Sequence, residues 1–282
     1  MKHALIFATL AAATLASGCR HRQENDEPLT LGEAQRALQE TSTSSQAGNL
    51  MSATIELSTD FTIGGGIEAA VAEIRSYIES QLPCAEITLG SGTLQVEYGA
   101  KPGNCTYRGH SYSGMHSVTV TANGEGQVIV QHDWDQLSND VVMLSGFATV
   151  TWDAVDAHRR VNHELTWTRV SDGKAGIGRG DRTQRPLEGN SLVGMTVDGE
   201  RAWSGEAGTW ELDIDGIEVR WADPVPQAGR YTLVTPSDKE IELSFERLDE
   251  DTIVVELSGT KNSFSFLVSS SGAIESAGES SE

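Results

Sequence analysis

The chain has 282 residues and a formal net charge of −21, with 20 basic against 41 acidic side chains. So acidic a protein is repelled by nucleic acid and by other anionic phosphate surfaces, which excludes nucleic-acid binding as a function class. The length suffices for one large β domain or for two smaller ones.

The first nineteen residues have the features of an export signal. Lys2 and His3 form a short basic region, and the apolar run that follows, about a dozen residues long, is too short to span a bilayer. It closes with Leu15-Ala16-Ser17-Gly18-Cys19, which resembles the lipobox of bacterial lipoproteins. We therefore predict a lipoprotein signal peptide over residues 1–18 and a lipid such as palmitate on Cys19. An ordinary secretory signal is the alternative. The residue after the cysteine is not Asp, which favours the outer membrane under the sorting rule of enteric bacteria.

The two remaining cysteines fit an exported chain. With Cys19 assigned to lipid, Cys84 and Cys105 are left as an even pair, most simply a disulfide. Closing a loop of about twenty residues stabilises a fold by roughly 3 kcal/mol in the chain-entropy model. A reactive or metal-binding thiol pair is the alternative, but neither cysteine has a CxxC spacing or a histidine at ligand spacing.

Residues 19–50 have the composition of a lipid-anchored tether with one short helix. Thr30-Leu31-Gly32-Glu33 has the form of a capping box, and Leu31, Ala34 and Leu38 then share one helical face. The segment 41–49 is rich in Ser, Thr, Gln and Gly, which is typical of a flexible linker.

The folded domain is predicted over residues 51–268. A first strand is expected at 53–57, followed by an amphipathic helix at 66–81, whose apolar side chains recur at three- and four-residue steps and should pack on a sheet face. From Thr93 to Val170, apolar and polar residues alternate in five segments separated by turn residues, which indicates an antiparallel meander.

Beyond Val170 the pattern is looser. The segment 173–185 reads as a polar loop or an irregular strand, so a division into two sub-lobes near 171–190 stays open. Its Gly176-Ile177-Gly178-Arg179-Gly180 is not a dinucleotide-binding motif. Short strands resume from about 192 to 268, and the tail 269–282 has the composition of a disordered acidic segment. The predicted fold class is mainly β, with antiparallel meander or sandwich-like sheets, one helix on a sheet face and a second short N-terminal helix.

Three histidines lie in the inward phase of their strands and invite a metal-site interpretation. If Val120 pairs with Val128, then His116 lies opposite His132, close enough to share a ligand or a hydrogen bond. Continuing the registers puts His132 opposite Leu144 and His163 opposite Ala148, about 13 Å from the other two. A three-histidine site fails in this register, and Asp133 points to the other face. His116 and His132 remain as weak metal candidates, and no metal or cofactor is expected.

Catalytic templates are not matched. The carboxylates near strand ends could include a glycosidase pair, and the six tryptophans could line a carbohydrate groove, with core packing as the simpler interpretation. The acids in question are Asp133, Asp135, Asp140, Asp153 and Asp156, and Trp152 and Trp167 share the inward phase.

Several longer strings carry a resemblance. FTIG, PCAE, GNCTYRGHSYSG, HDWDQLSN, FATVTW, HELTWTR and DIDGIEVRWADPVPQAG together resemble an uncharacterised family of lipid-anchored, β-rich proteins of Gram-negative bacteria, myxobacteria in particular. The resemblance covers most of the chain after the signal peptide. It implies a lipid anchor and a β-rich architecture, and no activity, cofactor or site residue.

We therefore expect a cell-envelope lipoprotein, attached to the membrane through its N-terminal lipid, that acts through binding or structure. A protein or glycan partner in the envelope fits this expectation. The alternative is an envelope enzyme or sugar-binding protein that uses loop carboxylates and tryptophans.

Overall fold

The computed structural model describes residues 27–59, 67–90, 92–107, 110–122, 128–153, 158–189, 193–220, 225–249, 251–269 and 274–280. The predicted signal peptide and the predicted lipidation site at Cys19 lie outside these residues. Within them, no helix is both long enough and apolar enough to cross a membrane.

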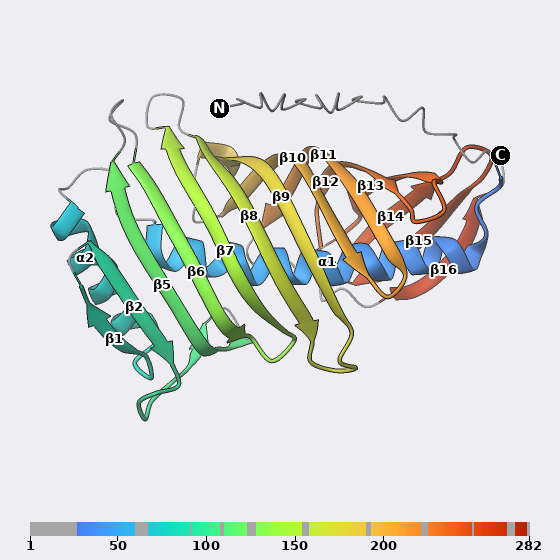
Figure 1. The fold of residues 1–282 in the computed structure, drawn as a ribbon. Helices are drawn as coiled ribbons and strands as arrows, with labels where there is room; N and C mark the ends of the chain where they lie inside the picture. The colour runs from blue at the N-terminus through green and yellow to red at the C-terminus, as the bar shows by residue number, and fades with distance from the viewer. Residues whose placement is uncertain are drawn as a thin grey trace, which may run out of the picture.

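The fold is mainly β, as predicted, and it is built on one antiparallel sheet of 14 strands (Figure 1). Apart from a separate two-stranded sheet of β3 and β4, each strand pairs with the next along the chain, so the order is that of a meander. The strands of the large sheet are β1 (Glu86–Leu89), β2 (Thr93–Tyr98), β5 (Ser113–Ala122), β6 (Val128–Ser138), β7 (Val142–Asp153), β8 (His158–Arg169), β9 (Ala175–Pro186), β10 (Gly194–Gly205), β11 (Gly208–Arg220), β12 (Ala228–Val234), β13 (Glu240–Arg247), β14 (Thr252–Ser258), β15 (Ser263–Ser269) and β16 (Ile274–Ser280); β3 is Thr106–Tyr107 and β4 is His110–Ser111.

The sheet curls around a long helix, α1 (Leu31–Thr59), so that α1 passes behind β5–β9 and in front of β14–β16 in Figure 1. Six side-chain contacts fix the helix along its length. They join Glu33 to Lys239, Thr43 to Arg169, Ser45 to Arg201, Met51 to Arg182, Thr54 to Trp134 and Glu56 to Arg159. The inward face of the sheet and this helix together form the core of the protein.

The N-terminal part of the chain differs from its prediction. The capping box is present, because Thr30 N donates to Glu33 Oε2 at 2.8 Å and Glu33 N donates to Thr30 Oγ1 at 3.2 Å. The helix that it starts is not short, however. It runs through the expected linker at 41–49 and through the expected strand at 53–57, both of which are helical.

Two physical reasons explain this difference. Hydroxyls inside the helix donate back to its own carbonyls, as Thr43 does to Gln39 at 2.9 Å and Ser58 to Thr54 at 2.9 Å, so these side chains can be buried without losing their hydrogen bonds. The last turns are covered on several sides, by β6, β7 and the second helix α2 (Ile67–Gln81), and every residue from Met51 to Ser58 is buried. A helix without an exposed face has no apolar stripe for sequence analysis to find.

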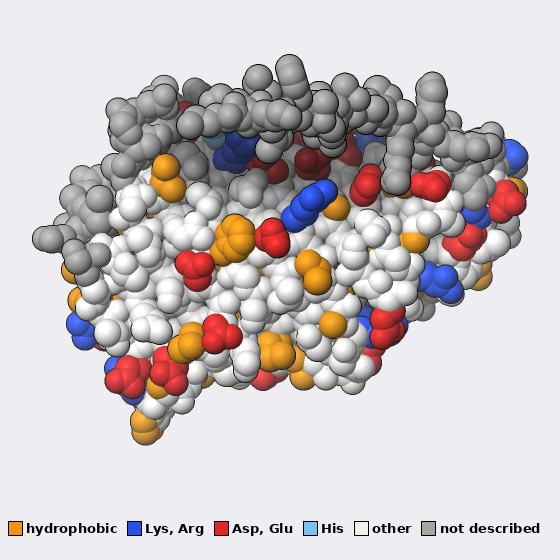
Figure 2. Space-filling model, viewed as in Figure 1, with side chains coloured by type: hydrophobic (Ala, Val, Ile, Leu, Met, Phe, Trp, Pro, Cys, Tyr) orange, Lys and Arg blue, Asp and Glu red, His pale blue; other side chains and the backbone are white. Residues whose placement is uncertain are grey.

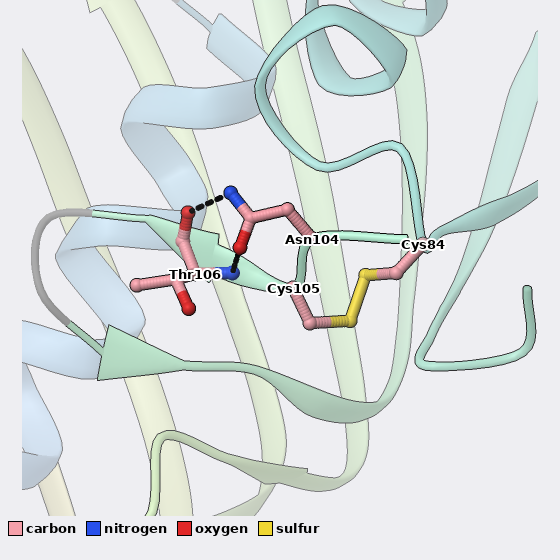
Figure 3. Close-up of a disulfide and its surroundings, with 4 residues drawn as sticks. All are labelled: Cys84, Asn104, Cys105 and Thr106. Atoms are coloured by element: carbon pink, nitrogen blue, oxygen red, sulfur yellow. Dashed lines mark hydrogen bonds between the residues drawn. A yellow bond between two sulfur atoms is a disulfide. The ribbon is translucent and has the colours of Figure 1, made fainter. Parts of the chain in front are cut away.

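The second helix and the disulfide agree with their predictions. Within α2, Ile74 and Ile78 are fully buried, as is Leu82 just after it, and the helix contacts β1, β2 and β5. Cys84 and Cys105 form the disulfide, which joins the segment after α2 to the strand β3 (Figure 3). Beside it, the Asn104 side chain accepts from Thr106 N at 2.9 Å and donates to Thr106 O at 3.3 Å, which closes the turn.

The segment 173–185 is neither a loop nor a lobe boundary. It forms β9, which pairs with β8 on one side and with β10 on the other, so the sheet continues without a break. Glycines 176, 178 and 180 occupy the inward positions, where Cβ atoms at Gly176 and Gly180 would lie 2.4 Å from the Trp167 ring and 2.5 Å from the His163 ring. The glycines therefore make room for large neighbours, and their loop-like composition reflects packing.

The C-terminus also differs from its prediction. The expected disordered tail contains β16, which pairs with β15. On the face of the molecule shown in Figure 2, hydrophobic side chains are scattered singly. Phe147 and Ile177 are among the large hydrophobic side chains that are exposed. Scattered apolar side chains are normal for a solvated surface and indicate no docking patch there.

Candidate functional site

The candidate histidines lie on the inner face, but in a different register from the one expected. His116 pairs with Trp134, and Val118 pairs with His132, which in turn lies opposite Ala148 rather than Leu144. His163 lies opposite Ala148 as predicted. The shift is two residues between β5 and β6 and four residues between β6 and β7, and even shifts keep the same face inward because side chains alternate with a period of two. His132, Ala148 and His163 therefore lie in one row across the strands, and the expected four-residue offset of His163 from His132 is wrong.

Despite that shift, His116 and His132 are in contact across a diagonal. Nε2 of His116 lies 3.0 Å from Nδ1 of His132, and the Tyr98 hydroxyl lies 3.5 Å from the other nitrogen of His116. The two rings stack on each other and on Trp134, with ring centroids 5.2 to 5.7 Å apart. Of the two facing nitrogens, one must donate and the other must accept, so at least one of the two histidine rings must be neutral.

The surroundings hold all three inward histidines neutral. Burial lowers the pKa of His116 to about 3 and lowers that of His132 well below the usual value, with further contributions from His116 and Arg159. Burial, then the charges of Arg182 and Arg201, lower the pKa of His163 to about 2. Among the described residues, no group of three or more His, Cys, Asp or Glu side chains is placed to hold a metal ion. His116 and His132 are thus two members of a stacked, hydrogen-bonded core cluster.

Three of the acids considered for sugar chemistry, Asp133, Asp135 and Asp140, do not converge with Trp134 and Trp167. Asp133 and Asp135 are exposed on the outer face, and Trp134 between them is buried on the inner face. Asp140 is exposed in the turn before β7, and Trp167 is buried in the core. Asp156 lies outside the described residues. Acids and indole rings on opposite faces of one sheet cannot contact the same sugar.

A depression of about 490 Å³ also lies mainly on the outer face of the sheet. Its lining mixes acids with Arg179 and the exposed Phe147, and it includes Glu164, Asp181, Glu200, Glu211 and Asp213. The closest partner of Asp181 is Arg160, which pairs with it through two nitrogens. These are solvated side chains of a strongly acidic surface.

A different set of polar side chains lies between α1 and the sheet. Arg159, Arg182 and Arg201 come from the adjacent strands β8, β9 and β10, and all three point inward and are at least nine-tenths buried. Arg159 forms an ion pair with Glu56 of α1 and donates through Nε to Gln184 Oε1 at 2.7 Å. Its charge is therefore compensated within the core.

Arg182 and Arg201 have no such compensation from any carboxylate in the described part of the chain. Arg201 donates to the Ser45 hydroxyl at 2.9 Å and stacks near the rings of Trp203 and Tyr231 at 5.8 and 5.7 Å. Nη2 of Arg182 lies 4.0 Å from the Met51 sulfur, a weak acceptor. The Nε atoms of both arginines are buried without a hydrogen-bond partner among the described residues.

The two guanidinium groups meet beneath one residue of the helix. A Cβ atom at Gly48 would lie 3.5 Å from Arg201 Nη1 and 3.6 Å from Arg182 Nη1. Burial, then the charge of Arg201, lowers the pKa of Arg182 to about 9, and burial also lowers the pKa of Arg201. Both groups still carry their charge at neutral pH, so two positive charges are buried side by side.

Two neighbouring cavities lie beside α1, and the smaller one is lined by these arginines. A small one of about 40 Å³ lies between Arg182, Gln184 and Arg201 on the sheet and small or polar residues of α1. A larger one of about 170 Å³ lies between α1 and β12–β15. Both are lined by Ser45, Pro226 and Tyr231, which places the cavities next to each other.

The larger cavity has one polar and one apolar side. Mostly polar side chains of α1 line one side of it. The other side is mainly aliphatic and aromatic, formed by Leu243, Phe245, Val255 and Val268 of the sheet and by Val225 before β12, and Arg169 at the end of β8 also lines the cavity. Sequence analysis singled out neither the cavity nor the arginines. The sequence indicated the arginines only through strand alternation. Arg159 lies an even number of residues from the inward Val161 and His163, and Arg201 lies two residues from the inward Trp203.

Comparison with protein families, with curated proteins and with solved structures finds no match for this chain. The function is therefore inferred from the sequence and from the geometry described above.

Proposed function

We propose that this protein is a lipid-anchored binding protein of the cell envelope, which holds a small amphiphilic molecule between α1 and the C-terminal half of its sheet. The anchor is supported by the lipobox-like sequence that ends at Cys19 and by the disulfide, which fits an oxidising compartment. The binding site is the 170 Å³ cavity, and this cavity is the observation that carries the proposal.

The size and lining of the cavity suit a short alkyl chain. A cavity of about 150 Å³ lined by aliphatic and aromatic side chains is large enough to bind a six-carbon ring. A ligand that fills the cavity removes its apolar lining from water, which favours binding.

The walls of the cavity are fixed before any ligand arrives. At one end of α1, Lys239 Nζ donates to Glu33 Oε1 at 2.8 Å and Leu29 N donates to Asn262 Oδ1 at 2.9 Å. At the other end, Trp134 Nε1 donates to the Thr54 hydroxyl at 3.1 Å. A site held in shape by its scaffold loses little conformational entropy on binding, which favours a binding role over a purely structural one.

Calorimetric titration of octan-1-ol into the protein tests this proposal. The chain should carry Cys19→Ser, which removes the predicted acylation site and allows work without detergent. We expect saturable binding with one site per chain. Val268→Phe fills part of the cavity and should weaken binding about tenfold, equivalent to 1.4 kcal/mol.

Val170→Phe is the matched control, because Val170 is exposed and is not among the cavity-lining residues. It should leave the affinity unchanged, and near-ultraviolet circular dichroism should show that both variants are folded. Absence of saturable binding in the parent protein, or equal affinities for the parent and the folded Val268→Phe variant, would contradict the proposal.

A further inference from the structure

Arg182 and Arg201 are placed to bind an anion, and we infer that they recognise the carboxylate head of an amphiphile whose alkyl chain lies in the adjoining cavity. This inference rests on the proposed function and adds the chemical class of the ligand. Its natural class would be short- to medium-chain carboxylic acids. Three features support it: the two charges have no carboxylate partner among the described residues, a small space lies beside them, and that space is next to the apolar cavity.

The isolation of the charges is the first step. A buried cation is ordinarily paired with a carboxylate, as Arg159 is with Glu56 in this same interface. Arg182 and Arg201 lie on the next two strands, equally buried, and face Ser45, Gly48 and Ser52 of the helix, none of which carries a charge. An anion bound between them would supply the missing compensation.

The donors available at this point match a carboxylate. Each guanidinium offers several N–H groups, and the Nε of each is unpartnered among the described residues. The space between them and α1 is about 40 Å³, close to the volume of one or two small polar groups and too small for a bulky head. Two guanidinium groups on either side of a carboxylate can each donate to one of its oxygens.

Gly48 faces both guanidinium groups. A Cβ atom there would lie at ordinary contact distance, 3.5 Å from Arg201 Nη1 and 3.6 Å from Arg182 Nη1, so a side chain at this position would cover the two groups from the side of the helix. Glycine costs helix stability relative to alanine, and here it leaves the two groups uncovered.

The alkyl chain of such a ligand would lie in the neighbouring cavity. Ser45 and Tyr231 line both cavities, and the larger cavity continues along α1 from Ser45 towards Leu38. Seven residues of helix span about 10 Å, which sets the length scale for an alkyl chain of roughly eight carbons. The head therefore binds at Arg201 and the chain extends over Leu243 and Val255.

Calorimetry with octanoate and octan-1-ol, in the full chain carrying Cys19→Ser at pH 7, tests the assignment. The two probes share the chain and differ in the charge of the head. Octanoate should bind at least about tenfold more tightly than octan-1-ol. Arg182→Gln and Arg201→Gln should each reduce that ratio towards one, because each should weaken octanoate binding more than octan-1-ol binding.

Arg179→Gln is the matched control, because Arg179 lies on the same strand with its side chain exposed on the outer face. It should leave the ratio as in the parent protein. Equal binding of the two probes in the parent protein, or a ratio that survives both inner substitutions, would overturn the anion site and leave the proposed function standing.

A second measurement needs no variant at the buried positions and separates the two proposals. Acetate carries the head without the chain and should compete with octanoate more strongly than with octan-1-ol. The control is a non-coordinating salt at the same ionic strength. If neither eight-carbon probe binds but acetate raises the melting temperature more than this salt does, the anion site stands and the proposed function fails. If acetate also has no effect, both proposals fail.

Discussion

His116 and His132 donate and accept one hydrogen bond between their rings, at 3.0 Å, although strand pairing places neither opposite the other. Because both rings are buried and stacked on Trp134, this contact belongs to the core and carries a stability that depends on pH.

The first prediction concerns the pH dependence of stability that buried histidines cause, tested at His163. The folded-state pKa of His163, about 2, lies below the usual 6.5, so between these values the unfolded chain binds a proton that the folded chain does not. Stability should be fully present above pH 6.5 and fall as the pH falls below it, by up to about 1.4 kcal/mol per pH unit for each buried histidine. Urea unfolding of the parent protein and of His163→Gln from pH 7 to 5 should show a shallower slope in the variant. Equal slopes would mean that His163 is not held neutral.

A second prediction concerns the glycines of β9. Gly180→Ala places a Cβ 2.5 Å from the His163 ring and 2.9 Å from a backbone oxygen, so it should destabilise the fold by about 1 to 3 kcal/mol. Gly178→Ala is the comparison, because its Cβ would meet nothing closer than 3.4 Å. It should have a much smaller effect in the same chemical denaturation experiment. If both variants are equally stable, then β9 does not pack as described.

The disulfide gives a third prediction. Cys84 and Cys105 are separated by 21 residues, so replacing both with alanine should lower the free energy of unfolding by roughly 3 kcal/mol through the entropy of the unfolded chain. Adding a reducing agent should lower the melting temperature of the parent protein to that of the double variant. An unchanged melting temperature would indicate that the thiols are free in solution.

The start of α1 gives a fourth prediction. The hydrogen bond from Lys239, followed by bonds from Thr30, lowers the pKa of Glu33 to about 2, below its usual 4.5. The corresponding stability should be present above pH 4.5 and be lost as the pH falls towards 2. Glu33→Gln keeps a side chain that can complete the capping box and removes the charge, so it should lower stability at pH 6 and lose that difference near pH 2. Lys239→Gln should behave in the same way, and a variant difference independent of pH would exclude the ion pair as its cause.

The fifth prediction concerns the anchor. Cells grown with an alkyne-tagged palmitate should label the protein, and Cys19→Ser should abolish the label, because the cysteine thiol is the predicted acylation site. Mass spectrometry of the purified protein should show a diacylglyceryl-modified N-terminus at residue 19. A labelled Cys19→Ser variant, or a mature chain that begins elsewhere, would exclude the lipobox interpretation.

Sequence analysis located most strands and the disulfide because their signals are local. Alternation assigned the inward faces of β5 to β8 correctly, and it also gave the pairing of Val150 with Val161. Register between β5 and β6 was wrong by two residues, since alternation is unchanged by such a shift.

The helix and the candidate site were harder to predict. The buried half of α1 has no apolar stripe, and its Thr54 and Ser58 gain hydrogen bonds only once the helix exists. Arg182 and Arg201 belong to a site that depends on four strands and a helix far away in sequence, so no short motif describes it.

The position of α1 in the chain sets the order in which this protein can be assembled. Neighbouring strands of a meander pair over short sequence separations and can zip together one after another. The helix comes before all of them, yet its first residues are held by Lys239 and Asn262, more than two hundred residues later. Until the last strands have left the ribosome, the helix lacks part of the sheet that encloses it. Truncation within the C-terminal strands should therefore expose its buried Ser- and Thr-rich surface, and a chain exported in the unfolded state would complete its core only after almost its whole length has crossed the membrane.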